Sequence, residues 1–155
     1  MKKEVLVDSD ILSYFFRGDR QVFLKFSEYS EYFDTINISI LTYYEIVSGL
    51  KFRDSRKRLG EFKEFVIDSC LILPLTEESV EISSDIYSKL RKEGTPIDDV
   101  DLLIAGTAIN YNLIMVTNNV KHFGRINSLE IENWKGKKIN SLFRQGTCCQ
   151  VCPIR

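Results

Sequence analysis

A short apolar run that stops at an aspartate is the feature that most limits what this chain can fold into. Residues Val5–Val7 are β-branched at both ends of the run, and no polar side chain interrupts it. Such a run is typical of a strand buried on both faces of a parallel sheet. Asp8 follows at once, and open α/β sheets hold their ligands beyond the carboxyl ends of the strands. The run therefore predicts that Asp8 lies where such folds carry out their chemistry.

Further apolar runs alternate with amphipathic segments along the rest of the chain. Buried or alternating strands are expected at residues 35–39, 70–73, 113–116 and 129–131. Helices are expected at residues 10–16, 22–29, 40–50, 59–66, 77–92 and 98–109, and a short one before Phe123. Strands that alternate with helices predict an α/β fold with a mainly parallel sheet of about five strands, covered on both sides.

Length and charge indicate one domain that does not grip long stretches of nucleic acid. The 155 residues suffice for a single core, and we expect a domain at residues 1–134 and a C-terminal tail at 135–155, whose lack of periodicity is typical of disorder. The net charge is −1, whereas proteins with extensive phosphate contacts are usually basic. No targeting signal or membrane span is evident, since Asp8 and Asp10 interrupt the N-terminal apolar run. A cytoplasmic protein without membrane contact is expected.

The four cysteines favour a reduced, intracellular protein with a thiol-bearing tail over a protein with a structural zinc site. Cys70 lies in an apolar run and is interpreted as a buried thiol. Cys148, Cys149 and Cys152 crowd the tail, but His122 is the only histidine and no second cysteine pair exists. A structural zinc site is therefore not favoured.

Four polar residues, each at the end of a predicted strand or on a predicted helix, are candidates for a functional site. Asp8 follows the first strand, Glu45 lies on the third helix, Asp101 opens the buried helix, and Asn119 follows the fourth strand. Each also has a structural explanation: Glu45 completes a capping-box pattern with Thr42, and aspartates favour helix N-termini. Asn119 suits a turn. Taken singly, the structural explanations are favoured.

Taken together, the carboxylates predict a site for a hard cation. Asp10 is interpreted as the N-cap of the first helix, which leaves Asp8 without a capping role. Asp101 stands on a helix rich in leucine, isoleucine and alanine, where an unpaired carboxylate is costly. Clustered carboxylates repel one another unless a cation neutralises them, and oxygen ligands suit Mg²⁺, with Mn²⁺ as the alternative. Such metals serve phosphoryl chemistry.

Four motifs in order resemble those of the PIN-domain ribonucleases, and closely the VapC-type toxins of toxin–antitoxin pairs. They are Val5-Leu6-Val7-Asp8-Ser9-Asp10, Thr42-x-x-Glu45-x-x-x-Gly49, Asp101-Leu102-Leu103-Ile104-Ala105 and Val116-Thr117-Asn118-Asn119-x-Lys121-His122-Phe123. The resemblance covers residues 5–134, where Leu129-Glu130-Ile131-Glu132-Asn133-Trp134 looks like the end of the family's pattern. It implies a three-layer α/β/α fold and a Mg²⁺-dependent endoribonuclease.

The resemblance also implies roles for individual residues. Asp8, Glu45 and Asp101 match the family's three acidic positions and would bind the metal, with Glu45 bound directly or through water. Asn119 matches a fourth catalytic position that is often Asp, and the neutral side chain puts a second metal in doubt. Two further residues are expected in the outer shell of the metal: Asp98, one helical turn before Asp101 on the same face, and Thr117, which would hydrogen-bond a metal-bound water.

Basic residues near the pattern are candidates for RNA binding. Arg17, Arg20, Lys51 and Arg53 are predicted to contact phosphates, together with the rest of the basic run at residues 51–58. A solvated helix start explains that run equally well. The resemblance further implies structured RNA such as tRNA as substrate, a VapB-like antitoxin as partner, and a homodimer.

Two other classes of protein share parts of this pattern. Phosphatases of the haloacid dehalogenase type also place an Asp-x-Asp motif after a first strand, but they want Thr or Val where Leu12 stands. A catalytically inactive PIN fold that binds RNA or protein is the second alternative, and the three filled acidic positions speak against it. Phosphoenzyme trapping and a metal-dependent RNA cleavage assay would separate the three.

Overall fold

A five-stranded sheet, parallel throughout, organises the molecule in the computed structural model, which describes residues 2–136. Its strands lie in the order β3-β2-β1-β4-β5, so that β1 occupies the centre. They are β1 (Val5–Val7), β2 (Ile36–Ser39), β3 (Cys70–Leu73), β4 (Ile114–Val116) and β5 (Ile131–Glu132). The predicted fold class and number of strands are confirmed.

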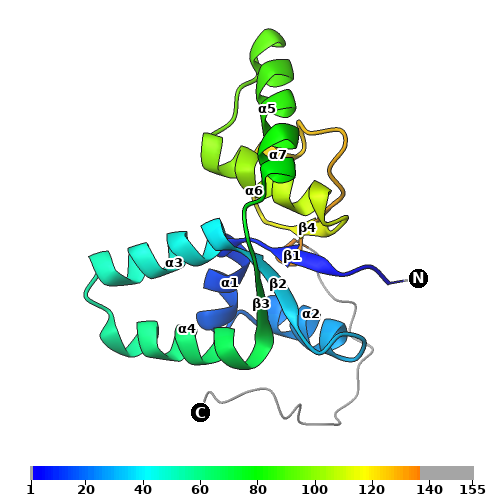
Figure 1. The fold of residues 1–155 in the computed structure, drawn as a ribbon. Coiled ribbons are helices and arrows are strands. Elements are labelled where there is room, and N and C mark those ends of the chain that lie inside the picture. Colours follow the sequence, from blue (N-terminus) through cyan, green and yellow to red (C-terminus); the bar gives the residue numbers. More distant parts are fainter. Residues whose placement is uncertain (1, 137–155) are drawn as a thin grey trace.

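Helices cover the sheet on both faces (Figure 1). They are α1 (Ser9–Phe16), α2 (Arg20–Ser30), α3 (Ile40–Phe52), α4 (Arg56–Ser69), α5 (Glu77–Lys92), α6 (Asp99–Asn110) and the short α7 (Val120–Phe123). The first four lie together in the lower part of the view, and α5 and α6 rise together in the upper part. Within residues 2–136, no helix is both long and apolar enough to cross a membrane.

The alternation of side chains along the strands gives each face its own core. Val5 and Val7 of β1 point into the core shared with α1, α2 and α4, whereas Leu6 between them points into the core shared with α5 and α6. The side chains of β4 alternate in the same way. Ile114 and Val116 point into the first core, and Met115 points into the second core with Leu6. All of these side chains are buried, as expected for a central strand covered on both faces.

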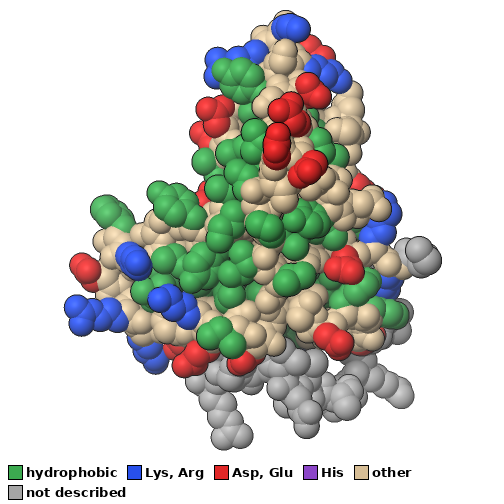
Figure 2. All heavy atoms as spheres, in the orientation of Figure 1, with side chains coloured by type: hydrophobic (Ala, Val, Ile, Leu, Met, Phe, Trp, Pro, Cys, Tyr) green, Lys and Arg blue, Asp and Glu red, His purple; other side chains and the backbone are tan. Residues whose placement is uncertain are grey.

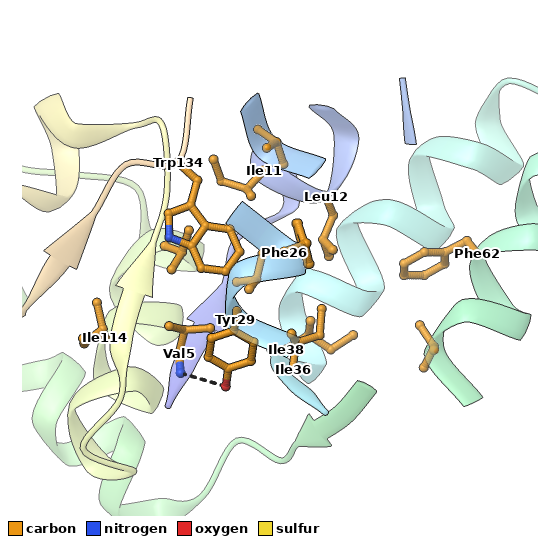
Figure 3. Close-up of a cluster of buried hydrophobic side chains, with 14 residues drawn as sticks. Val5, Ile11, Leu12, Phe26, Tyr29, Ile36, Ile38, Phe62, Ile114 and Trp134 are labelled. Atoms are coloured by element: carbon orange, nitrogen blue, oxygen red, sulfur yellow. Dashed lines mark hydrogen bonds between the residues drawn. The ribbon is translucent and has the colours of Figure 1, made fainter. Parts of the chain in front are cut away.

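Aromatic rings fill the first of these cores (Figure 3). The ring of Trp134 packs edge-on against Phe26, with their centroids 5.0 Å apart, and the Tyr29 hydroxyl accepts a hydrogen bond from the backbone N–H of Val5. The next residue, Lys135, forms an ion pair with Asp19. The domain predicted at residues 1–134 therefore makes contacts up to Lys135. Residues 137–155, with the three clustered cysteines, lie outside the described part of the chain.

The outer strands differ from their predicted form. The fifth strand begins two residues later than predicted and ends one residue later, and Leu129 packs into the second core from the loop before β5. Strand β3 lies at the edge of the sheet and is not fully buried: Leu71 is 52% exposed and Cys70 is half-buried. An apolar run alone cannot distinguish a central strand from an edge strand.

Close packing of α6 against α5 sets the position of the helix that carries Asp101. A Cβ atom on Gly106 would lie 2.0 Å from Oγ of Ser83, so no larger side chain fits there. The same Ser83 hydroxyl donates to the carbonyls of Ser79 and Leu102, at 2.7 and 2.9 Å. It thereby ties the two helices together where they touch.

Candidate active site at the carboxyl ends of the strands

Asp8 lies at the carboxyl end of the central strand, as predicted. Its backbone N–H donates to the carbonyl of Val116 at the end of β4, at 2.9 Å. Thr117, the next residue of that chain segment, donates from its hydroxyl to Oδ2 of Asp8 at 2.8 Å. Both side chains are buried, with Asp8 6% and Thr117 0% exposed. Thr117 therefore contacts the Asp8 carboxylate directly, and its predicted contact with a metal-bound water remains a prediction.

The assignment of Asp10 as the helix N-cap was wrong, because Asp8 takes that role. Asp8 has extended backbone angles, and its Oδ1 accepts from the N–H of Ser9 at 2.8 Å. Helix α1 therefore begins one residue earlier than predicted, and Asp10 lies in its first turn. There Oδ2 of Asp10 accepts from the backbone N–H of Asn118 at 3.0 Å. Its other oxygen, Oδ1, is buried and has no hydrogen-bond partner among residues 2–136.

The environment of Asp8 disfavours its ionised form. Burial, and next the negative charge of Asp10, raise the pKa of Asp8 to about 7. Hydrogen bonds from Thr117 and Ser9 act in the opposite direction, since they stabilise the carboxylate. A carboxyl group that titrates near neutrality at a strand end is a strong candidate for a functional residue.

Glu45 reaches the same region from helix α3 and does not cap that helix. The N-cap is Ser39, whose Oγ accepts from the N–H of Thr42 at 2.9 Å, so the capping-box interpretation of Glu45 does not hold. The Oε2 atom of Glu45 is buried without a partner in the described part of the chain. Burial raises the pKa of Glu45, and the charges of Asp101, Asp98 and Asp10 raise it further.

Asp101 lies in the first turn of α6 beside two residues from the segment after β4. Its Oδ2 is 3.4 Å from Nδ2 of Asn119 and 3.3 Å from Nδ1 of His122, and those two nitrogens are 3.1 Å apart. Burial raises the pKa of Asp101, and the contact with His122 opposes that rise. No role was predicted for His122 from sequence, although its position three residues after Asn119, in a predicted helical turn, places both on one face.

Asp98 is the N-cap of α6 and remains exposed. Its side chain accepts from the N–H of Val100 at 2.9 Å. Its negative charge raises the pKa of both Glu45 and Asp101, so it lies within electrostatic reach of the two carboxylates. The structure shows the capping role, and the predicted contribution to a metal site remains a prediction.

A pocket of about 360 Å³ between α1, α3 and α4 joins Glu45 to basic side chains. Arg17, Arg53 and Arg58 line it together with Glu45, whereas Arg20 and Lys51 do not. In the space-filling view, Lys and Arg side chains gather over the end of α3 and the start of α4 (Figure 2). In such a pocket the carboxylate can bind a cation and the arginines can bind a phosphate group that accompanies the cation.

The donor set fits a hard divalent cation in its chemistry. All its donors are carboxylate or amide oxygens, and two of these, on Asp10 and Glu45, are buried without a partner. Within residues 2–136, no three Asp, Glu, His or Cys side chains are already gathered closely enough to hold a metal ion. The structure thus brings the predicted residues to one edge of the sheet and leaves their final arrangement around a cation open.

Comparison with known proteins defines the class to which this fold and site belong. The PIN domain model matches residues 5–129, and the chain belongs to the PIN domain family. Within that family it is similar to VapC ribonucleases. The Ribonuclease VapC1 of Methanocaldococcus jannaschii is 34% identical over 129 residues, which cover 81% of this chain and 82% of that protein.

Two further relatives extend this similarity. The tRNA(fMet)-specific endonuclease VapC of Salmonella typhimurium is 31% identical over 97 residues, which cover 63% of this chain and 74% of that protein. Among solved structures, a chain of the VapBC2 complex of Rickettsia felis, bound to a promoter DNA fragment, superposes with a TM-score of 0.77 at 25% identity. The match covers 84% of this chain and 98% of that one.

Proposed function

We propose that this protein is a metal-dependent endoribonuclease and the toxin of a toxin–antitoxin pair. The observation that carries the proposal is the buried Asp8 at the end of the central strand, with its pKa raised to about 7 and Glu45 and Asp101 nearby. Buried carboxylates without a cationic partner close by are costly, and a bound cation would offset that cost. The similarity to VapC ribonucleases supports RNA as the substrate.

Asp8, Glu45 and Asp101 would hold the cation, Mg²⁺ or alternatively Mn²⁺. When bound, such an ion neutralises the carboxylates, activates a water molecule and stabilises the charge that develops on the phosphodiester. Thr117 keeps Oδ2 of Asp8 in place through its hydroxyl. Asn119 and His122 contact Oδ2 of Asp101. These contacts orient the carboxylates without adding negative charge.

Arg17, Arg53 and Arg58 supply phosphate contacts in the pocket next to Glu45. Arginine suits this role because its planar guanidinium binds phosphate oxygens in pairs. Replacing Arg17 or Arg53 with Ala should weaken RNA binding in EDTA and reduce the salt dependence by about one phosphate contact each. Arg20→Ala and Lys51→Ala are the matched controls, since neither residue lines the pocket. Equal effects of all four would contradict this placement of the RNA.

The partners follow from the relatives rather than from the chain itself. A structured RNA such as tRNA is proposed as substrate because a VapC relative is a tRNA(fMet)-specific endonuclease. A VapB-like antitoxin is proposed as partner because a structural neighbour was solved as a VapBC complex. The homodimer is proposed on the family resemblance alone, and light scattering of the purified chain would test it.

Cleavage of tRNA by the purified full chain, with and without Mg²⁺, tests the central proposal. We expect cleavage with Mg²⁺ or Mn²⁺ that is lost in EDTA and in Asp8→Asn. Asp99→Asn is the control, because it removes a charge from the exposed side of the same helix start as Asp101. Robust cleavage in EDTA would rule out the mechanism, and no cleavage under any condition would favour the inactive binding module.

A further inference from the structure

Asp10 is a charged side chain at this site that the proposed mechanism leaves unused. It does not cap α1, because Asp8 does. It forms no salt bridge with any Lys or Arg of residues 2–136. A carboxylate held away from water without a cationic partner costs free energy, so its presence calls for an explanation.

The hydrogen bond that Asp10 makes does not require a carboxylate. Its Oδ2 accepts from the backbone N–H of Asn118 and so ties the first turn of α1 to the segment after β4. An asparagine would supply the same acceptor from a side chain of the same shape. Backbone N–H groups of Asn118, Ile11 and Asn119 lower the pKa of Asp10, but burial outweighs them and raises it, so these contacts do not account for its negative charge.

Asp10 interacts electrostatically with the other carboxylates of the site. Its Oδ1 is buried without a partner, as is Oε2 of Glu45. The charge of Asp10 acts on Asp8 and Glu45, and that of Asp101 acts on Asp10. The four carboxylates thus influence one another electrostatically, although within residues 2–136 no three of them are close enough to hold an ion, and the neighbouring Asn119 is neutral.

We propose that Asp10 is a fourth carboxylate ligand of the cation site, with Oδ1 as the atom that faces the ion. This inference rests on the proposed metal-dependent function. Because Asn119 is neutral, the segment after β4 contributes no negative charge at that position. Asp10 would supply this charge instead. Asp10 accepts a hydrogen bond from the backbone N–H of Asn118. An aspartate at the next position, 119, would therefore place its carboxylate close to where that of Asp10 lies.

Binding of Mn²⁺ to the full chain, measured by calorimetry without RNA, tests the inference. The matched variants are Asp10→Asn, which keeps the acceptor for Asn118 and removes the charge, and Asp99→Asn, which removes an exposed charge nearby. We expect Asp10→Asn to weaken Mn²⁺ binding about 10- to 100-fold and Asp99→Asn to leave it within about twofold. Adding Asn119→Asp to Asp10→Asn should restore most of the affinity.

The outcomes separate this inference from the proposed function. Binding by Asp10→Asn as tight as wild type, together with loss of binding in Asp8→Asn, would overturn the role of Asp10 and leave the proposed function standing. Failure of the wild type to bind Mn²⁺ or Mg²⁺ would overturn both. Asn119→Asp alone should tighten Mn²⁺ binding. If Asp10→Asn does not fold, this single variant still tests the inference. Weaker Mn²⁺ binding by Asn119→Asp would then count against the proposed role of Asp10.

Discussion

The hydroxyl of Thr117 donates to Oδ2 of Asp8 across 2.8 Å, and so joins two residues 109 positions apart in the chain. The bond connects the ends of β4 and β1, the two strands that meet at the centre of the sheet. The same hydroxyl oxygen accepts from the backbone N–H of Asn119 at 3.0 Å. One buried side chain thus fixes both a carboxylate of the site and the loop that carries Asn119.

Replacing Thr117 with Val should test this connection. Valine has nearly the same shape but no hydroxyl, so it leaves a buried carboxylate oxygen and a backbone N–H without their partner. We expect a loss of about 1 to 3 kcal/mol in the free energy of unfolding, measured with urea. The pKa of Asp8 should rise further, because the Thr117 hydroxyl lowers it. Thr117→Ser keeps the hydroxyl and should retain most of the stability; equal losses in both variants would point to packing instead.

The raised pKa of Asp8 predicts how stability depends on pH in the absence of metal. An unfolded Asp8 loses its proton near pH 3.8, whereas the folded residue keeps it until about pH 7. The folded state therefore binds more protons in this window, and raising the pH through it destabilises the fold. Asp8→Asn cannot ionise, so it should match the wild type near pH 4 and exceed it above pH 7, by roughly 1 to 4 kcal/mol.

Thermal melts of both proteins with EDTA, at about pH 4 and about pH 8, would measure this difference. Because Asp10, Glu45 and Asp101 are present in both proteins, the comparison isolates the contribution of position 8. Mg²⁺ should then raise the melting temperature of the wild type much more than that of Asp8→Asn, since the ion binds only the folded site. A difference between the two proteins that does not change with pH would contradict the assigned pKa.

Gly106 should tolerate no larger residue. A methyl group there would overlap with Oγ of Ser83 and with the backbone carbonyl of Ser79, so Gly106→Ala should cost about 1 to 3 kcal/mol of stability. Gly60 is the matched control, since it lies in helix α4 with open space around it. Gly60→Ala should stabilise the protein by about 0.5 to 1 kcal/mol. Urea denaturation of both variants gives the comparison, and equal effects would contradict the close packing of α5 and α6.

Residues beyond Gly136 should be dispensable for folding and cleavage. A chain that stops after Gly136 keeps Trp134 in the core and the ion pair between Lys135 and Asp19. It should retain the melting temperature and the RNA cleavage of the full chain. A chain that stops after Asn133 loses both contacts and should be less stable by about 3 to 5 kcal/mol. A lower melting temperature in the first truncation would show that the tail contributes to the core.

The elements that sequence predicted best are those whose burial shows in their pattern. The central strands β1 and β4 read as apolar runs because both of their faces are covered, and α5 was predicted with its observed bounds. Strand β3 was misjudged because burial on an edge depends on what lies beside the strand. The positions of Asp8, Glu45 and Asp101 at one edge of the sheet followed from the parallel topology and the family resemblance.

The hydrogen bonds within the site could not be predicted from sequence, because they depend on backbone angles and on contacts between residues far apart in the chain. The N-cap of α1 is Asp8, two residues before the predicted Asp10, and both aspartates satisfy the same capping rule. His122 contacts Asp101 across 21 residues, and no local pattern predicts such a pair. Glu45 matched a capping box in sequence, but Ser39, one residue before the helix, had already met that requirement.

Trp134, which packs on Phe26, gives the molecule an optical reporter of its own. It is the only tryptophan of the chain, and its ring N–H donates to Glu132 at 3.0 Å. The backbone carbonyl of Glu132 accepts in turn from Thr117, the residue that holds Asp8. Fluorescence from this single indole therefore monitors the edge of the sheet where the carboxylates meet, and cation binding or loss of β5 can be followed without any attached dye.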